Sequence, residues 1–369
     1  MVQVPHPADL KALCLVSKHV SAIATQYLYR DLVLPYSDID RDWIDLRYLL
    51  KSRGLQYVQS LFVDSSNINT YGFCKPLNQL LRKLPLKSLT RFRYGTLGQP
   101  TDEGLRYLLQ HQDKLTNLQL DFSLMAPTLE ELIREEGTAI RSLNCLTELE
   151  MILGDETDTS PGKYSELLDM INVTRLKKVT LYANGDWRIF GLENAIERSL
   201  KSALPTSLKH LSLTNIPLPE LDEQYLQLDK FPSLRHLELH ECRSPAFTLD
   251  SFRQPMLTSF TIQLCSLWSP GEEDLAAVSR FLRRFGSLSR LIIGNQPVIS
   301  LDRIVDDLAV SIANHAASLR SLIIFVRCVA ISWKSFAEIP LRCKKLCQLV
   351  MPARMVDLVR QCQVSLSYL

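Results

Sequence analysis

Three histidines and one glutamate lie at matched places in two successive segments of the chain, and they carry the most distinctive chemistry in the sequence. The first segment is His210 to Thr214, and the second runs from His236 through Glu238 to His240. If the two segments form adjacent strands, His210 and His236 lie about 5 Å apart with Glu238 nearby. We expect this group to be an exposed polar surface for a partner, whose binding changes as the pH crosses about 6.5.

A metal site is the alternative interpretation of the same group. His236 and His240 are four residues apart on one strand, and this distance of about 13 Å is too long for the two rings to share one ion. His210, His236 and Glu238 remain as candidate ligands, but exposed polar residues are the favoured interpretation. We therefore expect no metal and no other cofactor.

The nine cysteines are scattered and form neither a disulfide pattern nor a zinc pattern. The densest group, Cys343, Cys347 and Cys362, lacks a fourth ligand and matches no standard zinc spacing. Cys242 and Cys265 each follow a short apolar segment that recurs along the chain. In proteins built from repeated segments of this kind, the residue at this place is often buried beside a turn. We expect both to be structural, and unclustered cysteines in a long chain indicate a reducing compartment.

The sequence lacks the motifs of the common catalytic sites. It contains no G-x-S-x-G elbow, no glycine-rich phosphate loop of either common type and no H-E-x-x-H. We expect a protein that is not an enzyme, and a catalyst with an unrecognised site is kept only as a minor alternative.

Charge and hydropathy exclude further classes of function. The formal net charge is +2 with a pI near 8.0, and no segment concentrates lysine and arginine, so we expect no nucleic-acid partner. The longest apolar stretch, Leu322 to Ile331, is interrupted by Arg327 and is too short for a membrane span. The N-terminus shows no secretory signal pattern. These features predict an intracellular protein, cytoplasmic and/or nuclear, without membrane association.

The elements that must position these residues follow from a repeated apolar pattern. A triplet of the form L-x-x-L-x-L, with other apolar residues at some positions, occurs eleven times between Val58 and Met351. Successive triplets begin roughly 23 to 32 residues apart, which is typical of repeats with one strand and one helix each. We predict an α/β leucine-rich-repeat solenoid, or horseshoe, with a C-terminal cap over residues 35–369. The triplets begin at Val58, Leu89, Leu115, Leu146, Leu176, Leu208, Leu234, Leu257, Leu288, Leu319 and Leu346.

Helical periodicity between the triplets predicts the convex side. The clearest segment runs from Ser269 to Gly286, with a capping serine, an acidic first turn and two arginines in the last turn. Further helices are predicted over residues 101–110, 128–142, 192–203, 301–316 and 353–361.

Alternate residues of a strand point to opposite faces, so the apolar triplet residues point inward and their neighbours line an exposed inner sheet. This surface passes from polar and acidic positions, through the histidines, to apolar positions from Ile292 onward. We predict that it binds a protein substrate, whose identity the sequence does not reveal. The residues predicted to make this contact are Arg91, Arg93, Asp121, Glu148, Glu150, Tyr182, His210, His236, Glu238, His240, Ile292 and Phe325.

The apolar end of this surface has two interpretations of equal weight. The side chains of Ile292, Ile323, Phe325 and Val350 form either a partner patch or a surface covered by residues 364–369 folding back as a cap.

The stretch before the repeats has a pattern of its own. Asp9-Leu10 opens a helix, the stretch from Leu13 to Lys18 ends it, and a second helix over Val20 to Ala24 leads to the exit L-Y-R-D-L at Leu28 to Leu32. Residues 5 to about 34 resemble the second and third helices of an F-box, and with irregular repeats behind them the chain looks most like F-box proteins of filamentous fungi. The L-P-x-E motif and first helix of an F-box do not precede these residues. We therefore expect a partial F-box over residues 1–34.

The resemblance implies a function. F-boxes bind a Skp-type adaptor, which attaches them to a cullin and a ubiquitin-conjugating enzyme, so the chain is expected to be a substrate-recognition subunit of an SCF-type ubiquitin ligase. The adaptor-binding residues that the resemblance implies are Pro7, Leu10, Leu13, Leu15, Val16 and Ile23.

Two alternatives stay open at this point. A plain helical cap for the first repeat is the other interpretation of residues 5–34, since solenoids need a cap at each end. A free-standing leucine-rich-repeat scaffold or inhibitor, without ligase association, is the alternative function.

Overall fold

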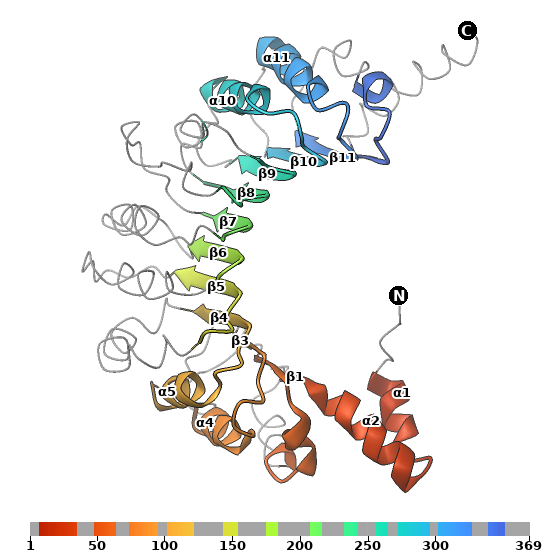
Figure 1. Cartoon of the computed structure of the whole chain (residues 1–369), viewed down its shortest axis with the longest axis vertical. Helices are drawn as coiled ribbons and strands as arrows, with labels where there is room; N and C mark the ends of the chain where they lie inside the picture. Colours follow the sequence, from red (N-terminus) through yellow and green to blue (C-terminus); the bar gives the residue numbers. More distant parts are fainter. Residues whose placement is uncertain are drawn as a thin grey trace. The chain divides into compact units, whose positions relative to one another are not determined.

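The described part of the chain is an α/β fold with parallel strands. In the computed structural model the described residues are 7–34, 48–63, 74–94, 102–121, 143–153, 175–183, 207–215, 232–242, 249, 256–264, 272–295, 302–326 and 339–350. The chain divides into two compact units: the first comprises Met1–Glu156 with Glu166–Leu176, and the second Thr157–Ser165 with Lys177–Leu369. Within each unit the strands follow one another in sequence order (Figure 1), the order that repeats of one strand and one crossover produce.

The first unit contains a parallel sheet in the order β1 to β5. Its strands are β1 (Asp31–Leu34), β2 (Ser60–Val63), β3 (Arg91–Tyr94), β4 (Asn117–Asp121) and β5 (Glu148–Leu153), and its helices are α1 (Pro7–Leu13), α2 (Lys18–Arg30), the 3-10 helix η1 (Arg53–Tyr57), α4 (Cys74–Lys83) and α5 (Asp102–His111). The register aligns Asp31, Ser60, Arg91, Asn117 and Glu148 in one row across the sheet.

The second unit repeats the arrangement. Its strands are β6 (Lys178–Ala183), β7 (His210–Thr214), β8 (His236–His240), β9 (Ser259–Leu264), β10 (Arg290–Asn295), β11 (Ser321–Val326) and β12 (Gln348–Val350), and its helices are α10 (Glu272–Arg283) and α11 (Asp302–Ala313). The equivalent row here contains His210, His236, Ser259, Arg290 and Ser321.

The triplet residues build the core, as the pattern predicts. Leu61, Phe92, Leu118 and Leu149 are aligned across the first unit and all are buried. The second unit has the same buried row at the equivalent positions: Val179, Leu211, Leu237, Phe260, Leu291 and Leu322. Burying one such side chain contributes about 1.5–3 kcal/mol, so stacked rows of them stabilise neighbouring repeats against one another.

A hydroxyl residue at the start of several strands ties one repeat to the next. The carbonyl oxygen of Gln59 accepts hydrogen bonds from the backbone N–H groups of Thr90 (2.7 Å) and Arg91 (3.1 Å) and from Thr90 Oγ1 (3.0 Å). Ser289 makes the same set of bonds to the carbonyl of Thr258 in the second unit. We call this arrangement the strand-start clamp. Members of the same kind are Thr90, Thr116, Thr147, Thr258 and Ser289.

The helix predictions are confirmed wherever the structure describes the residues. The segments predicted at 269–286 and 301–316 contain α10 and α11, and α5 matches the segment predicted at 101–110 except that it ends one residue later, at His111. Those predicted at 128–142, 192–203 and 353–361 lie outside the described residues. The sequence did not predict α4, which has no acidic residue in its first turn.

The first strand precedes the first predicted triplet. β1 runs parallel to β2, and it belongs to a Tyr29-Leu32-Leu34 triplet that a search for leucine in the first position misses. The Tyr29 ring covers Gly54 in η1 so closely that a Cβ at Gly54 would lie 2.6 Å from it. This contact fixes α2 against the first repeat.

Among the described residues, no helix combines the length and the apolar composition that crossing a membrane would require.

Candidate functional site

The second unit brings the predicted histidines together on one face of its sheet. The rings of His210 and His236, in register on β7 and β8, are stacked with their centroids 5.5 Å apart. Oε2 of Glu238 lies 3.7 Å from Nε2 of His210 and 3.7 Å from Nε2 of His240. These four residues form the histidine–glutamate cluster, and the spacing predicted for its first two members is confirmed.

The surroundings of the cluster shift the pKa values of its members in different directions. The neighbouring His210 and His240 rings hold the pKa of Glu238 well below its usual range, so this carboxylate stays charged. The same carboxylate raises the pKa of His240. Burial lowers the pKa of His236, and the charge of His210 lowers it further. At neutral pH His236 therefore presents a neutral ring, which both donates and accepts hydrogen bonds.

A short polar chain extends the cluster onto β9. The Oε1 atom of Gln263 lies 3.5 Å from Nδ1 of His240, and its amide Nε2 donates to Oε1 of Glu241 at 3.2 Å. Glu241 holds its place through a left-handed backbone, with φ of 53°, and a backbone hydrogen bond to the carbonyl of Gln263 at 2.7 Å. Gln263 holds the strand position of His240 in the next repeat and belongs to the predicted inner face, but the sequence analysis did not connect it with the histidines. Glu241 follows β8 and was not identified.

The geometry offers little to a metal ion. Among the residues that the structure describes, no group of three or more histidine, cysteine, aspartate or glutamate side chains is arranged to hold one. The cluster presents hydrogen-bond donors, acceptors and one fixed negative charge.

The first unit presents a different surface, made of arginines and acids. Asp31 on β1 forms ion pairs with Arg30 (3.1 Å) and with Arg91 on β3. Arg93 lies over the ring of Phe62, with its guanidinium carbon 5.1 Å from the ring centroid, and 4.0 Å from Glu150 on β5. Three of the predicted inner-face residues are thus ion-paired: Arg91 with Asp31, and Arg93 with Glu150 in what we call the charged network around Arg93.

A fourth predicted residue of this surface, Glu148 on β5, is hydrogen-bonded to a side chain of the neighbouring strand β4. Its Oε2 atom accepts a hydrogen bond of 2.7 Å from Nδ2 of Asn117. Asp121 lies at the end of β4, and its side chain is outside the described residues.

The expectation that every inner-face position is exposed is wrong at five places. Four of these are small or amide side chains that lie between longer neighbours on strands about 4.8 Å away, which cover them. One of the four, Ser212, is in register with Glu238. The fifth is the apolar Ile152 at the end of β5. The buried positions are Gln119, Ile152, Ser212, Ser259 and Thr261.

Among the predicted apolar positions of the second unit, one side chain is exposed to solvent. Phe325 on β11 is 55% exposed, whereas Ile292 and Ile323 are half-buried. Tyr182 on β6 is half-buried as well. The residues predicted to fold back as a cap, 364–369, lie outside the described part of the chain.

The two N-terminal helices, α1 and α2, begin near the predicted places, but α2 continues to Arg30, six residues beyond the predicted end at Ala24 and into the predicted exit segment. α1 starts at a proline, which suits the first helical position, and α2 starts after Ser17, whose Oγ accepts the Val20 N–H at 3.2 Å. Of the six residues implied to face an adaptor, Leu13, Leu15, Val16 and Ile23 are exposed. Pro7 and Leu10 lie in α1, and their side chains are outside the described residues.

The cysteines are placed as structural groups where they are described. Cys242 is buried, and its thiol donates to the carbonyl of Leu213 at 3.4 Å, as predicted. Burial raises the pKa of the Cys343 thiol, and the Cys347 thiol donates to the carbonyl of Arg320 at 3.2 Å. Cys265 and Cys362 lie outside the described residues.

No protein-family model matches the chain, and no curated protein matches it either.

Proposed function

We propose that the protein is a non-catalytic substrate-recognition subunit of an SCF-type ubiquitin ligase, acting in the cytoplasm, the nucleus or both. Its N-terminal helices bind a Skp-type adaptor and through it a cullin, while the inner face of its repeats holds a protein substrate. In the fold that we propose, a partial F-box over residues 1–34 is followed by a leucine-rich-repeat horseshoe with a C-terminal cap.

Exposed apolar side chains at the N-terminal helical pair carry the proposal. Leu15 is 89% exposed, Val16 67%, Ile23 47% and Leu13 41%. Leu15 and Val16 lie in the turn between α1 and α2, where no described part of the chain covers them. Apolar side chains gathered on a surface mark a site of protein contact, and these four coincide with positions at which F-box helices face their adaptor. We call them the N-terminal apolar patch.

The repeat surface supports the second half of the proposal. The charged network around Arg93 and the histidine–glutamate cluster both consist of half-exposed donors and acceptors on rigid strands, which suits recognition of a folded or extended polypeptide. The receptor works by positioning alone: binding both partners raises the effective concentration of substrate lysines near the conjugating enzyme.

Adaptor binding by the full chain tests the proposal. Isothermal titration calorimetry would compare the chain with a variant carrying Leu15→Asp and Val16→Asp, using a purified fungal Skp-type adaptor. Placing two charges in a desolvated contact should weaken binding by at least about a hundredfold. Val310→Asp is the matched control, since Val310 is 55% exposed on α11 in the other unit, and it should leave binding unchanged.

A second arm asks how much of an F-box is required. A version with an L-P-x-E helix grafted upstream of residue 1 is titrated beside the native chain. Binding by both, with loss in the double variant, supports the proposal, and binding by the grafted version alone means that the adaptor site needs the first helix. No binding by either version refutes the proposal.

The free-standing scaffold is the second candidate, and one feature of the first unit favours it. α2 continues directly into β1, which pairs with β2, and Tyr29 covers Gly54. The helical pair is thus joined to the first repeat as a cap would be. If the adaptor does not bind, this function becomes the preferred one.

A further inference from the structure

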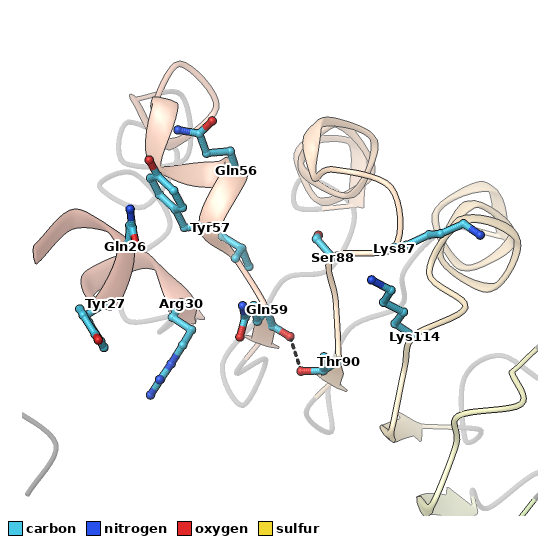
Figure 2. A pocket seen from close by; sticks show the side chains of 11 residues that line it. Gln26, Tyr27, Arg30, Gln56, Tyr57, Gln59, Lys87, Ser88, Thr90 and Lys114 are labelled. Atoms are coloured by element: carbon cyan, nitrogen blue, oxygen red, sulfur yellow. Dashed lines mark hydrogen bonds between the residues drawn. The ribbon is translucent and has the colours of Figure 1, made fainter. Parts of the chain in front are cut away.

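The first unit contains a polar cavity. It has a volume of about 560 Å³. Four segments line it: α2, η1 with the two residues after it, the turn before β3, and Lys114 shortly before β4 (Figure 2). The size falls within the range of about 300–1,000 Å³ for cavities that bind small molecules.

The charge around this cavity is positive. Its lining includes Arg30, Lys87 and Lys114, and none of the described residues that line it carries a carboxylate. Two of these cations already form ion pairs: Arg30 with Asp31 at 3.1 Å, and Lys87 with Asp113 at 2.7 Å. Lys114 is exposed and has no ion-pair partner among the described residues. An anion entering the cavity can therefore pair with Lys114 without breaking an existing ion pair.

The turn before β3 adds an unused hydrogen-bonding group. Ser88 lines the cavity, and its Oγ is shielded from solvent without a hydrogen-bond partner. Lys87 beside it has a left-handed backbone with φ of 59°, tied by its N–H to the carbonyl of His111 at 2.9 Å. Figure 2 shows the Lys114 side chain extending toward this turn, whereas the Lys87 side chain points away from Ser88. A hydroxyl donor and a free ammonium group thus lie along the same wall.

The opposite wall is aromatic and cationic. Tyr27 and Arg30 extend from the same side of α2 (Figure 2), with the guanidinium carbon 5.8 Å from the ring centroid. Tyr57 lies at the end of η1 and also lines the cavity. These rings provide apolar surface beside the positive charge, which suits an anion attached to an organic body better than a bare inorganic ion.

We propose that this cavity binds a phosphate monoester, with Lys114 pairing with the phosphate oxygens, Ser88 rotating its hydroxyl to donate a hydrogen bond to one of them, and Tyr27, Tyr57 and Arg30 contacting the organic part. A doubly charged group with three acceptor oxygens matches this set of donors, and a singly charged carboxylate matches it less well. The proposal is independent of adaptor binding, because no residue of the N-terminal apolar patch lines the cavity.

Calorimetric titration of the full chain with phenyl phosphate tests the proposal. We expect saturable binding at a dissociation constant of roughly 0.1–1 mM and binding of benzoate that is at least about tenfold weaker. Lys114→Gln should weaken phenyl phosphate binding about tenfold and Ser88→Ala about threefold, because each removes one donor to a charged group. Lys209→Gln is the matched control, since Lys209 is an exposed lysine before β7 in the other unit, and it should change binding less than about twofold.

Two results of these titrations would overturn the proposal. No saturable binding up to about 10 mM overturns the proposal, as does an equal loss in Lys114→Gln and Lys209→Gln, which would mean that net charge alone attracts the ligand. Circular dichroism of each variant establishes that the fold is retained. A peptide with one phosphoserine distinguishes the source of the phosphate: tighter binding than phenyl phosphate assigns the cavity to phosphorylated protein segments, and weaker binding assigns it to small metabolite-like esters.

Discussion

Two buried polar side chains, Gln112 in the first unit and His315 in the second, fill the same structural position with different chemistry. Each follows a helix of its repeat and reaches back to the backbone N–H of the first leucine in the preceding triplet. Leu89 N–H donates to Oε1 of Gln112 at 3.0 Å, and Leu288 N–H donates to Nδ1 of His315 at 3.4 Å. Each side chain also donates to a backbone carbonyl, Gln112 to Pro85 at 3.1 Å and His315 to Leu282 at 3.0 Å.

The difference between them lies in titration. An amide bridges the N–H and the carbonyl at any pH, whereas an imidazole does so only as the neutral tautomer, with its proton on Nε2. Burial lowers the pKa of His315 from 6.5 to about 4. The same pair of backbone groups can thus be bridged with or without a pH dependence, and the second unit has the pH-dependent bridge.

The largest effect is expected when either bridge is removed. His315→Leu leaves the Leu288 N–H and the Leu282 carbonyl unpaired, at about 1–3 kcal/mol apiece. Gln112→Leu leaves the Leu89 N–H unpaired, while the Pro85 carbonyl keeps the Ser88 N–H at 3.3 Å. We expect losses in the free energy of unfolding at pH 7 of about 4 kcal/mol for His315→Leu and about 2 kcal/mol for Gln112→Leu, measured by urea denaturation. Losses below about 1 kcal/mol in both variants would mean that water or backbone rearrangement replaces the bridge.

The pH dependence of the second unit comes next in size. Because the folded pKa of His315 is below the unfolded value, its contribution is complete above about pH 6.5 and is lost as the pH falls toward about 4. The difference between a pKa of 6.5 and one of about 4 corresponds to about 3 kcal/mol. His315→Gln should remove this dependence while leaving stability at pH 7 within about 1 kcal/mol. Hydrogen exchange at the Leu288 amide, with the Leu89 amide as internal control, would follow it directly.

The strand-start clamp offers a smaller effect that should be equal in the two units. Thr90→Val and Ser289→Ala remove one hydroxyl donor each, while the accepting carbonyl keeps its two backbone partners. We expect a loss of about 1 kcal/mol in each variant, independent of pH. A pH-dependent loss in only one of them would show that the two units differ in more than the Gln112 and His315 bridges.

The smallest effect concerns the histidine–glutamate cluster. Glu238→Gln removes the charge that raises the pKa of His240, so this pKa should fall, as seen by NMR titration. The raised pKa contributes stability below about pH 6.5 that is lost as the pH rises through the folded value. For partly exposed groups we expect about 0.5 kcal/mol in the free energy of unfolding. An unchanged pKa of His240 would refute the interaction.

The sequence predicted what depends on periodicity. The triplets located the core rows and the adjacency of His210 and His236, because leucines every two residues on a strand must share a face. β1 escaped this search since Tyr29 occupies the leucine position.

Features that depend on contacts between distant segments were beyond the same reasoning. Gln112 and His315 differ in residue type and in their distance to the next triplet leucine, three residues for one and four for the other, so no pattern connects them. The cavity is lined by segments from Gln26 to Lys114 that meet only after folding. Burial of Ser212 and Thr261 depends on the size of the neighbouring side chains rather than on strand alternation.

The strand-start clamp also bears on how such a chain can change its length. Each clamp aligns a strand through the residue at its beginning and a carbonyl of the preceding repeat, so the alignment does not depend on how many residues lie between strands. Lengthening a connecting loop costs little free energy, about 0.6 kcal/mol for each doubling. A chain built in this way can gain or lose residues between its strands and still keep its side chains in the same rows.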